Sequence, residues 1–250
     1  MFRFLTRLRK DSVAGKRFRN YIFYALGEIV LVVIGILFAL QINTWNNHRK
    51  LEDKEVAYLK DIRENLLHDY ENLQAYLAYN ELKIAMLDSS IGLVASKKPV
   101  IEVARTMDRR MAELSTYRYF YPRRTAFDNM VNAENIALIR DEALRESLSE
   151  YYFDKTLINT TQERAKKMNR TFVDYFSPLI LNKETLGQFY EGDFALPGPG
   201  DIDFRSDLKL ISIMFNLRMA TDGQRMDFEF KRDENIALRE VIDSFLQKDI

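Results

Sequence analysis

The most constraining feature of the sequence is an apolar segment near its N-terminus, from Ile22 to Ile42, 21 residues long. As an α-helix it would extend about 30 Å, the thickness of the hydrocarbon layer of a bilayer. A secretory signal peptide would have a shorter apolar region followed by a small-x-small cleavage site, and FALQIN at 38–43 offers no convincing site. We therefore expect a retained signal-anchor, with a transmembrane helix over residues 21–43, rather than a cleaved leader or a soluble core helix.

The charges on either side of this segment predict its direction. Residues 2–20 contain seven basic side chains and one acidic one, whereas the chain beyond the apolar run contains 30 basic and 35 acidic residues. By the positive-inside rule, residues 1–20 form a basic cytoplasmic tail, and residues 44–250 form an extracytoplasmic domain. In a bacterium with two membranes this places the chain in the inner membrane and its domain in the periplasm. A basic tail on a mildly acidic body argues against a nucleic-acid partner.

One acid, Glu28, interrupts the apolar segment at a cost of roughly 2–3 kcal/mol for insertion. At about 100° per residue one helix face carries a stripe of five residues, namely Tyr21, Tyr24, Glu28, Gly35 and Ala39. Small residues allow close approach of a second helix, and a buried carboxyl can donate a hydrogen bond to it. We expect this stripe to be a helix–helix interface, in a homo-oligomer or with another membrane or envelope protein. The alternatives are an acid that is merely tolerated and a proton relay.

Beyond the membrane segment the pattern predicts an all-α fold, in which the transmembrane helix continues into an antiparallel bundle of long helices. Apolar residues recur at three- and four-residue steps from Trp45 to Val94, close to a coiled-coil heptad, with Asn80 the polar exception. Further helices are expected at 99–114, 125–133, 141–176 and from 206 to the C-terminus, with Asp141 and Ser206 as N-caps and Ser177-Pro178 as a stop. A loop is expected at 187–203. The last helix is expected to bury Leu208, Ile211, Phe215, Met219, Met226, Phe230, Val241 and Phe245.

An aromatic and basic stretch provides the candidate binding surface of the domain. Its side chains could grip a carboxylate, a glycan or another protein, although aromatics between two helices can also simply pack on the core. The candidate residues are Tyr117, Arg118, Tyr119, Tyr121, Arg123 and Arg124.

Other chemistry has little support in the sequence. There is no cysteine, no nucleophile elbow and no glycine-rich phosphate loop, so we assign no catalytic residue and no cofactor. His48 and His68 would face opposite sides of a helix, and of the loop acids only Asp201 and Asp203 have calcium-like spacing, so no metal site is assigned.

The membrane segment resembles the opening of a known bacterial family. The similar residues are RNY at 19–21, YALGEIVLVVIGIL at 24–37, ALQIN at 39–43 and WN at 45–46. They resemble an uncharacterised family, domain of unknown function 6090, of Bacteroidota-type bacteria. A second segment, LIRD at 138–141 with the leucines and tyrosines that follow it, is also similar, but NAEN at 132–135 stands where a Ser-Gly-type turn is expected. The resemblance implies one membrane pass and a helical exterior, and it carries no activity.

These features favour a membrane-anchored periplasmic scaffold or adaptor that acts through protein–protein contacts. The alternative is a periplasmic sensing or ligand-binding module that signals to a partner through the single transmembrane helix. An enzyme with a cleft near the loop at 187–203 is a third reading. A converging polar cavity would favour the second or third, and an exposed apolar patch on a solid bundle would favour the first.

Overall fold

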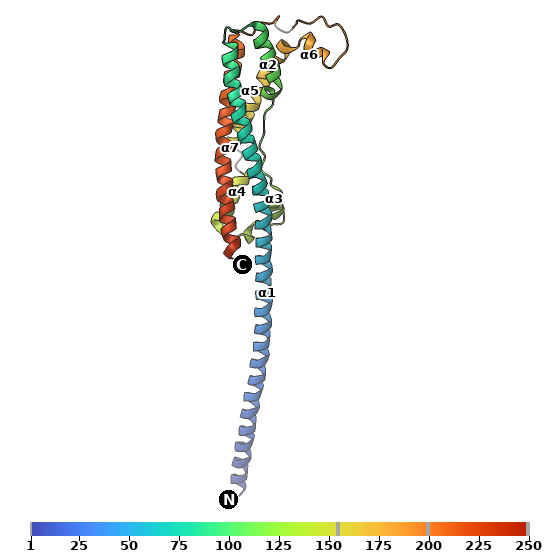
Figure 1. Cartoon of the computed structure of the whole chain (residues 1–250). Coiled ribbons are helices and arrows are strands. Elements are labelled where there is room, and N and C mark those ends of the chain that lie inside the picture. The colour runs from blue at the N-terminus through green and yellow to red at the C-terminus, as the bar shows by residue number, and fades with distance from the viewer. Residues whose placement is uncertain (1, 154–155, 199–200, 249–250) are drawn as a thin grey trace. The chain divides into compact units, whose positions relative to one another are not determined.

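The computed structural model describes the backbone of residues 2–153, 156–198 and 201–248, and the side chains of residues 21–153, 159–198 and 201–247. In this described part all regular structure is helical, which confirms the predicted fold class (Figure 1). The helices are α1 (Phe2–Val94), α2 (Val100–Ser115), α3 (Thr125–Asn132), a short 3-10 helix (Ile136–Leu138), α4 (Glu142–Phe153), α5 (Thr156–Ile180), α6 (Lys183–Gly187) and α7 (Leu208–Lys248).

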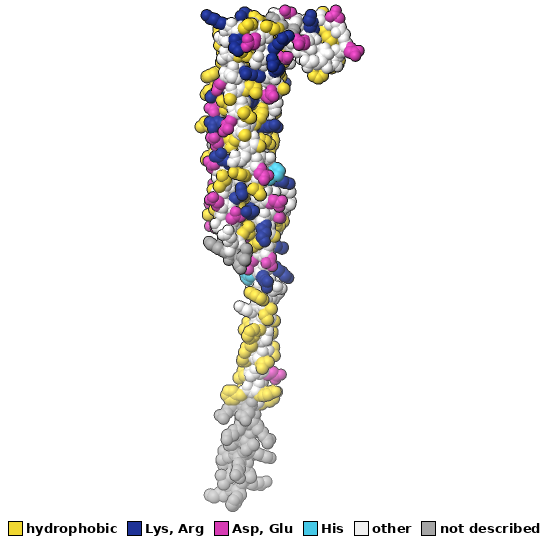
Figure 2. Space-filling view, viewed as in Figure 1, with side chains coloured by type: hydrophobic (Ala, Val, Ile, Leu, Met, Phe, Trp, Pro, Cys, Tyr) yellow, Lys and Arg dark blue, Asp and Glu magenta, His cyan; other side chains and the backbone are white. Residues whose placement is uncertain are grey.

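The chain divides into two compact units, Met1–Val56 and Ala57–Ile250, and α1 contributes residues to both. In the first unit the large apolar side chains from Tyr21 to Trp45 are exposed, and Figure 2 shows this stretch as a mainly apolar surface. Among the described residues, α1 is the one helix that is long and apolar enough to cross a membrane.

The second unit is an antiparallel bundle with four legs. Its first leg is the part of α1 after residue 56, and its last leg is α7. Two ion pairs show that α7 runs antiparallel to α1, since Asp88 pairs with Arg218 and the earlier Arg63 pairs with the later Asp243. The third leg consists of α4 and α5. The second leg is helical only at its ends, α2 and α3, and the intervening residues 116–124 have no helical structure, with Thr116 extended and Arg124 close to a helical conformation. We call these residues the strap (Figure 1).

The core of the second unit consists of three apolar clusters along the bundle. One cluster joins the 59–66 part of α1 to α3, α4 and the end of α7, and another joins the end of α1 to α2, α5 and the start of α7. A small cluster between them contains Phe120 of the strap and Phe228 of α7, whose rings meet edge to face at 6.2 Å. Buried polar residues occupy the levels between the clusters.

The face that α7 buries differs from the sequence prediction. The predicted core residues Leu208, Phe215, Met219, Met226, Phe230 and Val241 are exposed, and Ile211 and Phe245 are half-buried. The buried positions instead follow steps of four and three residues, the spacing of a heptad seam, and are Leu210, Met214, Leu217, Thr221, Gln224, Phe228, Lys231, Asn235, Leu238 and Ile242. Four of these ten are polar, which is why a search for apolar periodicity selects the wrong face.

Several helix ends also differ from prediction. Asp141 caps α4 as expected, accepting from the backbone N–H of Leu144 at 3.1 Å. The cap of α7 is Asp207, which accepts from the N–H of Leu210 at 3.0 Å, and the predicted cap Ser206 has φ 61° instead. Pro178 lies inside the last turn of α5, which ends two residues later. Proline removes one helical hydrogen bond but fixes a helical φ, so a final turn can tolerate it. The predicted helix 141–176 is described as α4 and α5, and residues 154–155 lie outside the described part.

Candidate functional site

The strap is the most unusual element of the bundle, because a non-helical segment among helices cannot pair its own backbone groups. Side chains from three helices supply the missing partners. Gln162 of α5 holds both backbone groups of Phe120, with Oε1 2.5 Å from its N and Nε2 3.2 Å from its O. Gln224 of α7 donates to the carbonyl of Arg118 at 2.8 Å. Near the ends of the strap, Asp69 of α1 accepts from the N–H of Arg123 at 2.9 Å, and Tyr79 donates to the carbonyl of Thr116 at 2.7 Å.

These bonds explain why polar residues stand at core positions of α1, α5 and α7. Gln162 and Asp69 are fully buried, and Gln224 is 2% exposed. Each would be costly to bury alone, and each is stabilised because it satisfies a backbone group of the strap. Asn80, the polar exception in the heptad of α1, is buried at the same level and lies 3.4 Å from Gln224 Oε1. The polar core residues therefore position the strap.

The lower polar level centres on Asp69. Its second carboxylate oxygen accepts from the hydroxyl of Tyr151 at 3.1 Å, and that hydroxyl also accepts from Asn235 at 3.1 Å. Burial raises the pKa of Asp69 to about 6, although the two hydrogen bonds and the electrostatic effects of the neighbouring His68 and Lys231 side chains oppose the increase. Asp69 therefore titrates near neutral pH while it holds the strap.

The upper polar level centres on Lys83. Its ammonium group donates to the carbonyl of Thr116 and, at 2.6 Å, to Oδ1 of Asn169, whose Nδ2 donates to the carbonyl of Ser115. Burial lowers the pKa of Lys83 to about 7. Asp69 and Lys83, two groups with shifted pKa values, thus form hydrogen bonds near opposite ends of the strap.

The outer surface of the strap carries the residues that the sequence singled out for binding. Tyr117, Arg118, Tyr121 and Arg123 are exposed, and Tyr119 and Arg124 are half-buried. Several of them are already engaged within the chain. Tyr119 stacks on Tyr121 at 4.5 Å, Arg118 lies over the ring of Tyr79 at 5.0 Å, and Arg124 lies over the ring of Phe153 at 5.1 Å. The strap surface is accessible, and its role in binding stays a prediction.

The five residues of the predicted transmembrane interface all lie on exposed positions of α1 in the first unit, namely Tyr21, Tyr24, Glu28, Gly35 and Ala39. A Cβ atom added at Gly35 would meet nothing within 4 Å. This face is therefore open to a second helix, and its role also stays a prediction.

Sequence reasoning missed a row of exposed apolar side chains on the second unit. It runs along the outside of α7, and we call it the α7 stripe, defined by Leu208, Phe215, Met219, Met226, Phe230 and Val241. The successive steps between these residues are seven, four, seven, four and eleven, which is an 11-residue repeat with Ala237 at the position between Phe230 and Val241. Eleven residues of α-helix make almost three whole turns. The stripe is therefore nearly straight. Exposed apolar side chains that gather on one face often mark an interaction site.

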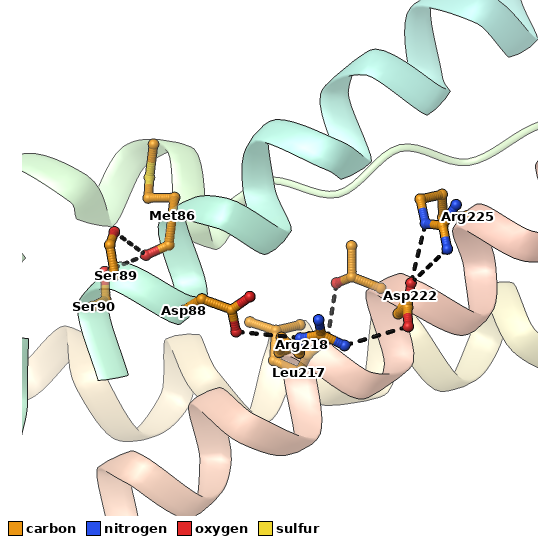
Figure 3. A network of polar contacts seen from close by, with 9 residues as sticks. Met86, Asp88, Ser89, Ser90, Leu217, Arg218, Asp222 and Arg225 are labelled. Carbon is orange, nitrogen blue, oxygen red and sulfur yellow. Dashed lines mark hydrogen bonds and ion pairs between the residues drawn. The ribbon is translucent and has the colours of Figure 1, made fainter. Parts of the chain in front are cut away.

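A chain of ion pairs borders the α7 stripe on one side (Figure 3). Arg218 contacts Asp88 of α1 at 3.2 Å and Asp222 at 3.3 Å, and Arg225 contacts Asp222 at 3.0 Å. Arg225 also reaches Glu229 at 2.6 Å. These charges are neutralised within the chain, so the border is polar without a strong field of one sign.

A hollow that could hold a small molecule lies where α2 meets α6 and residues 198–204. Its volume is about 190 Å³, below the roughly 300–1,000 Å³ of usual ligand pockets. Arg105 and Glu184 approach each other there at 3.9 Å, and burial raises the pKa of Asp108. The neighbouring loop acids have structural partners, because Asp201 accepts from the N–H of Gly198 at 2.6 Å and Asp203 pairs with Arg205 at 2.7 Å.

The fold and these surfaces define a class of protein, a helical bundle domain preceded by one apolar helix able to cross a membrane. The chain belongs to the Family of unknown function (DUF6090), whose family model matches residues 28–194. The matched range contains the strap and both polar levels of α1 and α5, and α7 follows it. No curated protein and no solved structure matched the chain.

Proposed function

We propose that the protein is a membrane-anchored scaffold or adaptor whose helical domain acts through protein–protein contacts. In this proposal residues 21–43 span the inner membrane, the N-terminal tail is cytoplasmic and the domain is periplasmic. The observation that carries the proposal is the α7 stripe, because six large apolar side chains on one face of α7 are exposed while other apolar residues of the domain form buried clusters. Such a surface is stabilised when a partner covers it.

Photo-crosslinking in native membranes tests this proposal. A benzophenone amino acid would replace Met226 or Phe230 in the stripe and, as a matched control, Leu82 of α1, which is 70% exposed against 72% for Phe230. We expect the stripe positions to give discrete protein adducts and the Leu82 position to give none. Equal labelling of all three positions would reject the stripe as a contact surface. A reporter enzyme fused to the C-terminus tests the topology, and activity confined to the cytoplasm would reject it.

The second candidate function is a sensing or ligand-binding module, and the hollow beside Arg105 and Asp108 is the observation that favours it. A ligand that binds the folded state raises the unfolding midpoint in proportion to the logarithm of its concentration. Thermal unfolding of the full chain with a panel of small carboxylates and phosphates is the test. A concentration-dependent rise that is lost in Arg105→Ala would support this candidate, and unchanged midpoints throughout the panel would reject it.

A further inference from the structure

The face of α7 that carries the stripe also contains a glycine for which packing within one chain gives no reason. Gly223 lies near the middle of the 41-residue helix α7, and a Cβ atom built there would meet nothing within 4 Å. Its backbone needs no left-handed conformation. Glycine inside a helix weakens it relative to alanine. Packing within one copy therefore gives no reason for glycine at this position.

The position of Gly223 on the helix supplies a reason. At about 100° per residue it lies on the same face as the stripe, between Met219 and Met226, and it is close to the midpoint between Leu208 and Val241. A missing side chain at the centre of an apolar stripe allows the backbone of a second helix to approach closely. The gap has large apolar neighbours on both sides that could pack around such a helix.

The charges around the stripe favour a protein over a lipid surface as the occupant. Helices that lie on membranes carry basic residues beside their apolar face. Here the cations Arg218 and Arg225 are paired with Asp222, and Arg232 is paired with Asp233 at 2.8 Å. This border lacks the excess of basic side chains that would attract anionic lipid, and its paired charges allow two identical surfaces to meet.

The exposed area is sufficient for a second copy of this chain. If a fully exposed large side chain offers roughly 200 Å², the six stripe residues together expose on the order of 700 Å². Two stripes facing each other would then bury on the order of 1,400 Å², within the usual size of a specific protein interface. An 11-residue repeat also gives both partners the same spacing over about 50 Å of helix.

We propose that the α7 stripe is a homotypic interface, in which the α7 helices of two copies of the chain pack along the stripe and approach most closely at Gly223. The inference rests on the proposed function, since it names the partner that covers the stripe. It predicts that the protein is a dimer through its helical domain, whether or not the transmembrane helices also associate.

Cysteine cross-linking of the purified full chain in nanodiscs tests the proposal, and the natural sequence contributes no background because it has no cysteine. Single cysteines would replace Leu208, Met226 or Val241 in the stripe and Leu82 as the control. We expect a short bismaleimide to link Met226→Cys into dimers about tenfold or more faster than Leu82→Cys, because a bound partner raises the effective thiol concentration. Homotypic links at all three stripe positions would mean parallel helices, and mixed Leu208–Val241 links would mean antiparallel ones. Both patterns support the interface.

Gly223→Ala provides a readout whose sign separates the interface from a structural role. The added methyl group should strengthen the helix of each copy and raise its unfolding midpoint, yet it should weaken the dimer about tenfold in dissociation constant, equivalent to the loss of one or two packed groups. The matched control is Gly92→Ala in α1, another helical glycine with nothing within 4 Å. We expect it to strengthen its helix without changing dimerisation.

The outcomes distinguish this inference from the proposed function. If Met226→Cys links no faster than Leu82→Cys, or if Gly223→Ala leaves dimerisation unchanged, the homotypic interface is wrong. If photo-crosslinking in membranes nevertheless joins the stripe to a different protein, the adaptor function stands without the dimer. If the stripe is joined to no protein in either setting, both proposals fail.

Discussion

The buried carboxyl of Asp69 makes a quantitative prediction about stability and pH. Its pKa is about 6 in the folded protein and 3.8 in the unfolded chain. Between these values the folded state binds more protons than the unfolded state, so the free energy of unfolding decreases as the pH rises from about 4 to about 6. A difference of about two units between the folded and unfolded pKa values corresponds to about 3 kcal/mol. The free energy of unfolding is lower by about this amount at pH 7, and it recovers as the pH falls to about 4.

Asp69→Asn removes this contribution with almost no change in shape. The amide oxygen can still accept from the N–H of Arg123, and its nitrogen can donate to the Tyr151 hydroxyl, which now lies 3.1 Å from Oδ2. Urea unfolding followed by circular dichroism at pH 4.5 and pH 7 measures the effect. The other acids titrate in both proteins, so the difference between them isolates Asp69. Between pH 4.5 and pH 7 we expect the free energy of unfolding of the variant to fall by about 1–3 kcal/mol less than that of the natural protein.

The control is Asp61→Asn, an exposed acid on the same helix. It should leave the pH dependence of the natural protein unchanged. The reasoning would be refuted if Asp69→Asn retained the full slope between pH 4.5 and pH 7, because the carboxyl would then be ionised in the fold at no cost.

Three further changes test the remaining features. The lowered pKa of Lys83 means that between about pH 7 and about pH 10 the unfolded chain binds a proton that the folded protein does not, so the free energy of unfolding should rise by on the order of 3 kcal/mol over this range. Lys83→Met should abolish that rise, and an unchanged alkaline profile of the variant would contradict the reasoning. Gln162→Leu leaves both backbone groups of Phe120 without their side-chain partner and should lower the free energy of unfolding in urea by about 2–4 kcal/mol. Glu163→Gln, at the exposed neighbouring position, should lower it by under about 0.5 kcal/mol, and equal losses would contradict the role of Gln162 in holding the strap. Glu134 has φ 58°, a left-handed conformation that favours glycine, so Glu134→Gly should raise the free energy of unfolding by about 0.5–1 kcal/mol. A lower unfolding midpoint in the variant would contradict this.

The turn at Glu134 also shows what a family pattern can anticipate. The sequence has NAEN where a Ser-Gly-type turn is expected, and the structure places a positive φ at that site. The backbone N–H of Asn135 bonds to the carbonyl of Met130 at 2.9 Å, which closes the end of α3. The turn is formed by its hydrogen bonds even though its residue is not the one that fits the conformation best.

Local sequence determined the helices and most of their ends. The repeat of apolar residues in α1, the proline before α2 and the carboxylate cap of α4 act within one or two turns of chain, so they can be interpreted without knowing the fold. The apolar segment at 22–42 likewise makes α1 long and apolar enough to cross a membrane by composition alone.

Tertiary structure decided which faces of those helices are inside. In α7 two stripes compete, an apolar one that ends up exposed and a seam with four polar members that is buried. Polar members of the seam are inside because they find partners on other elements: Gln224 donates to the carbonyl of Arg118 in the strap. Lys231 donates to the carbonyl of Tyr151, and Asn235 donates to the carbonyl of Leu66. Sequence periodicity records only local spacing, whereas a buried backbone group is satisfied by whichever side chain the whole fold brings to it.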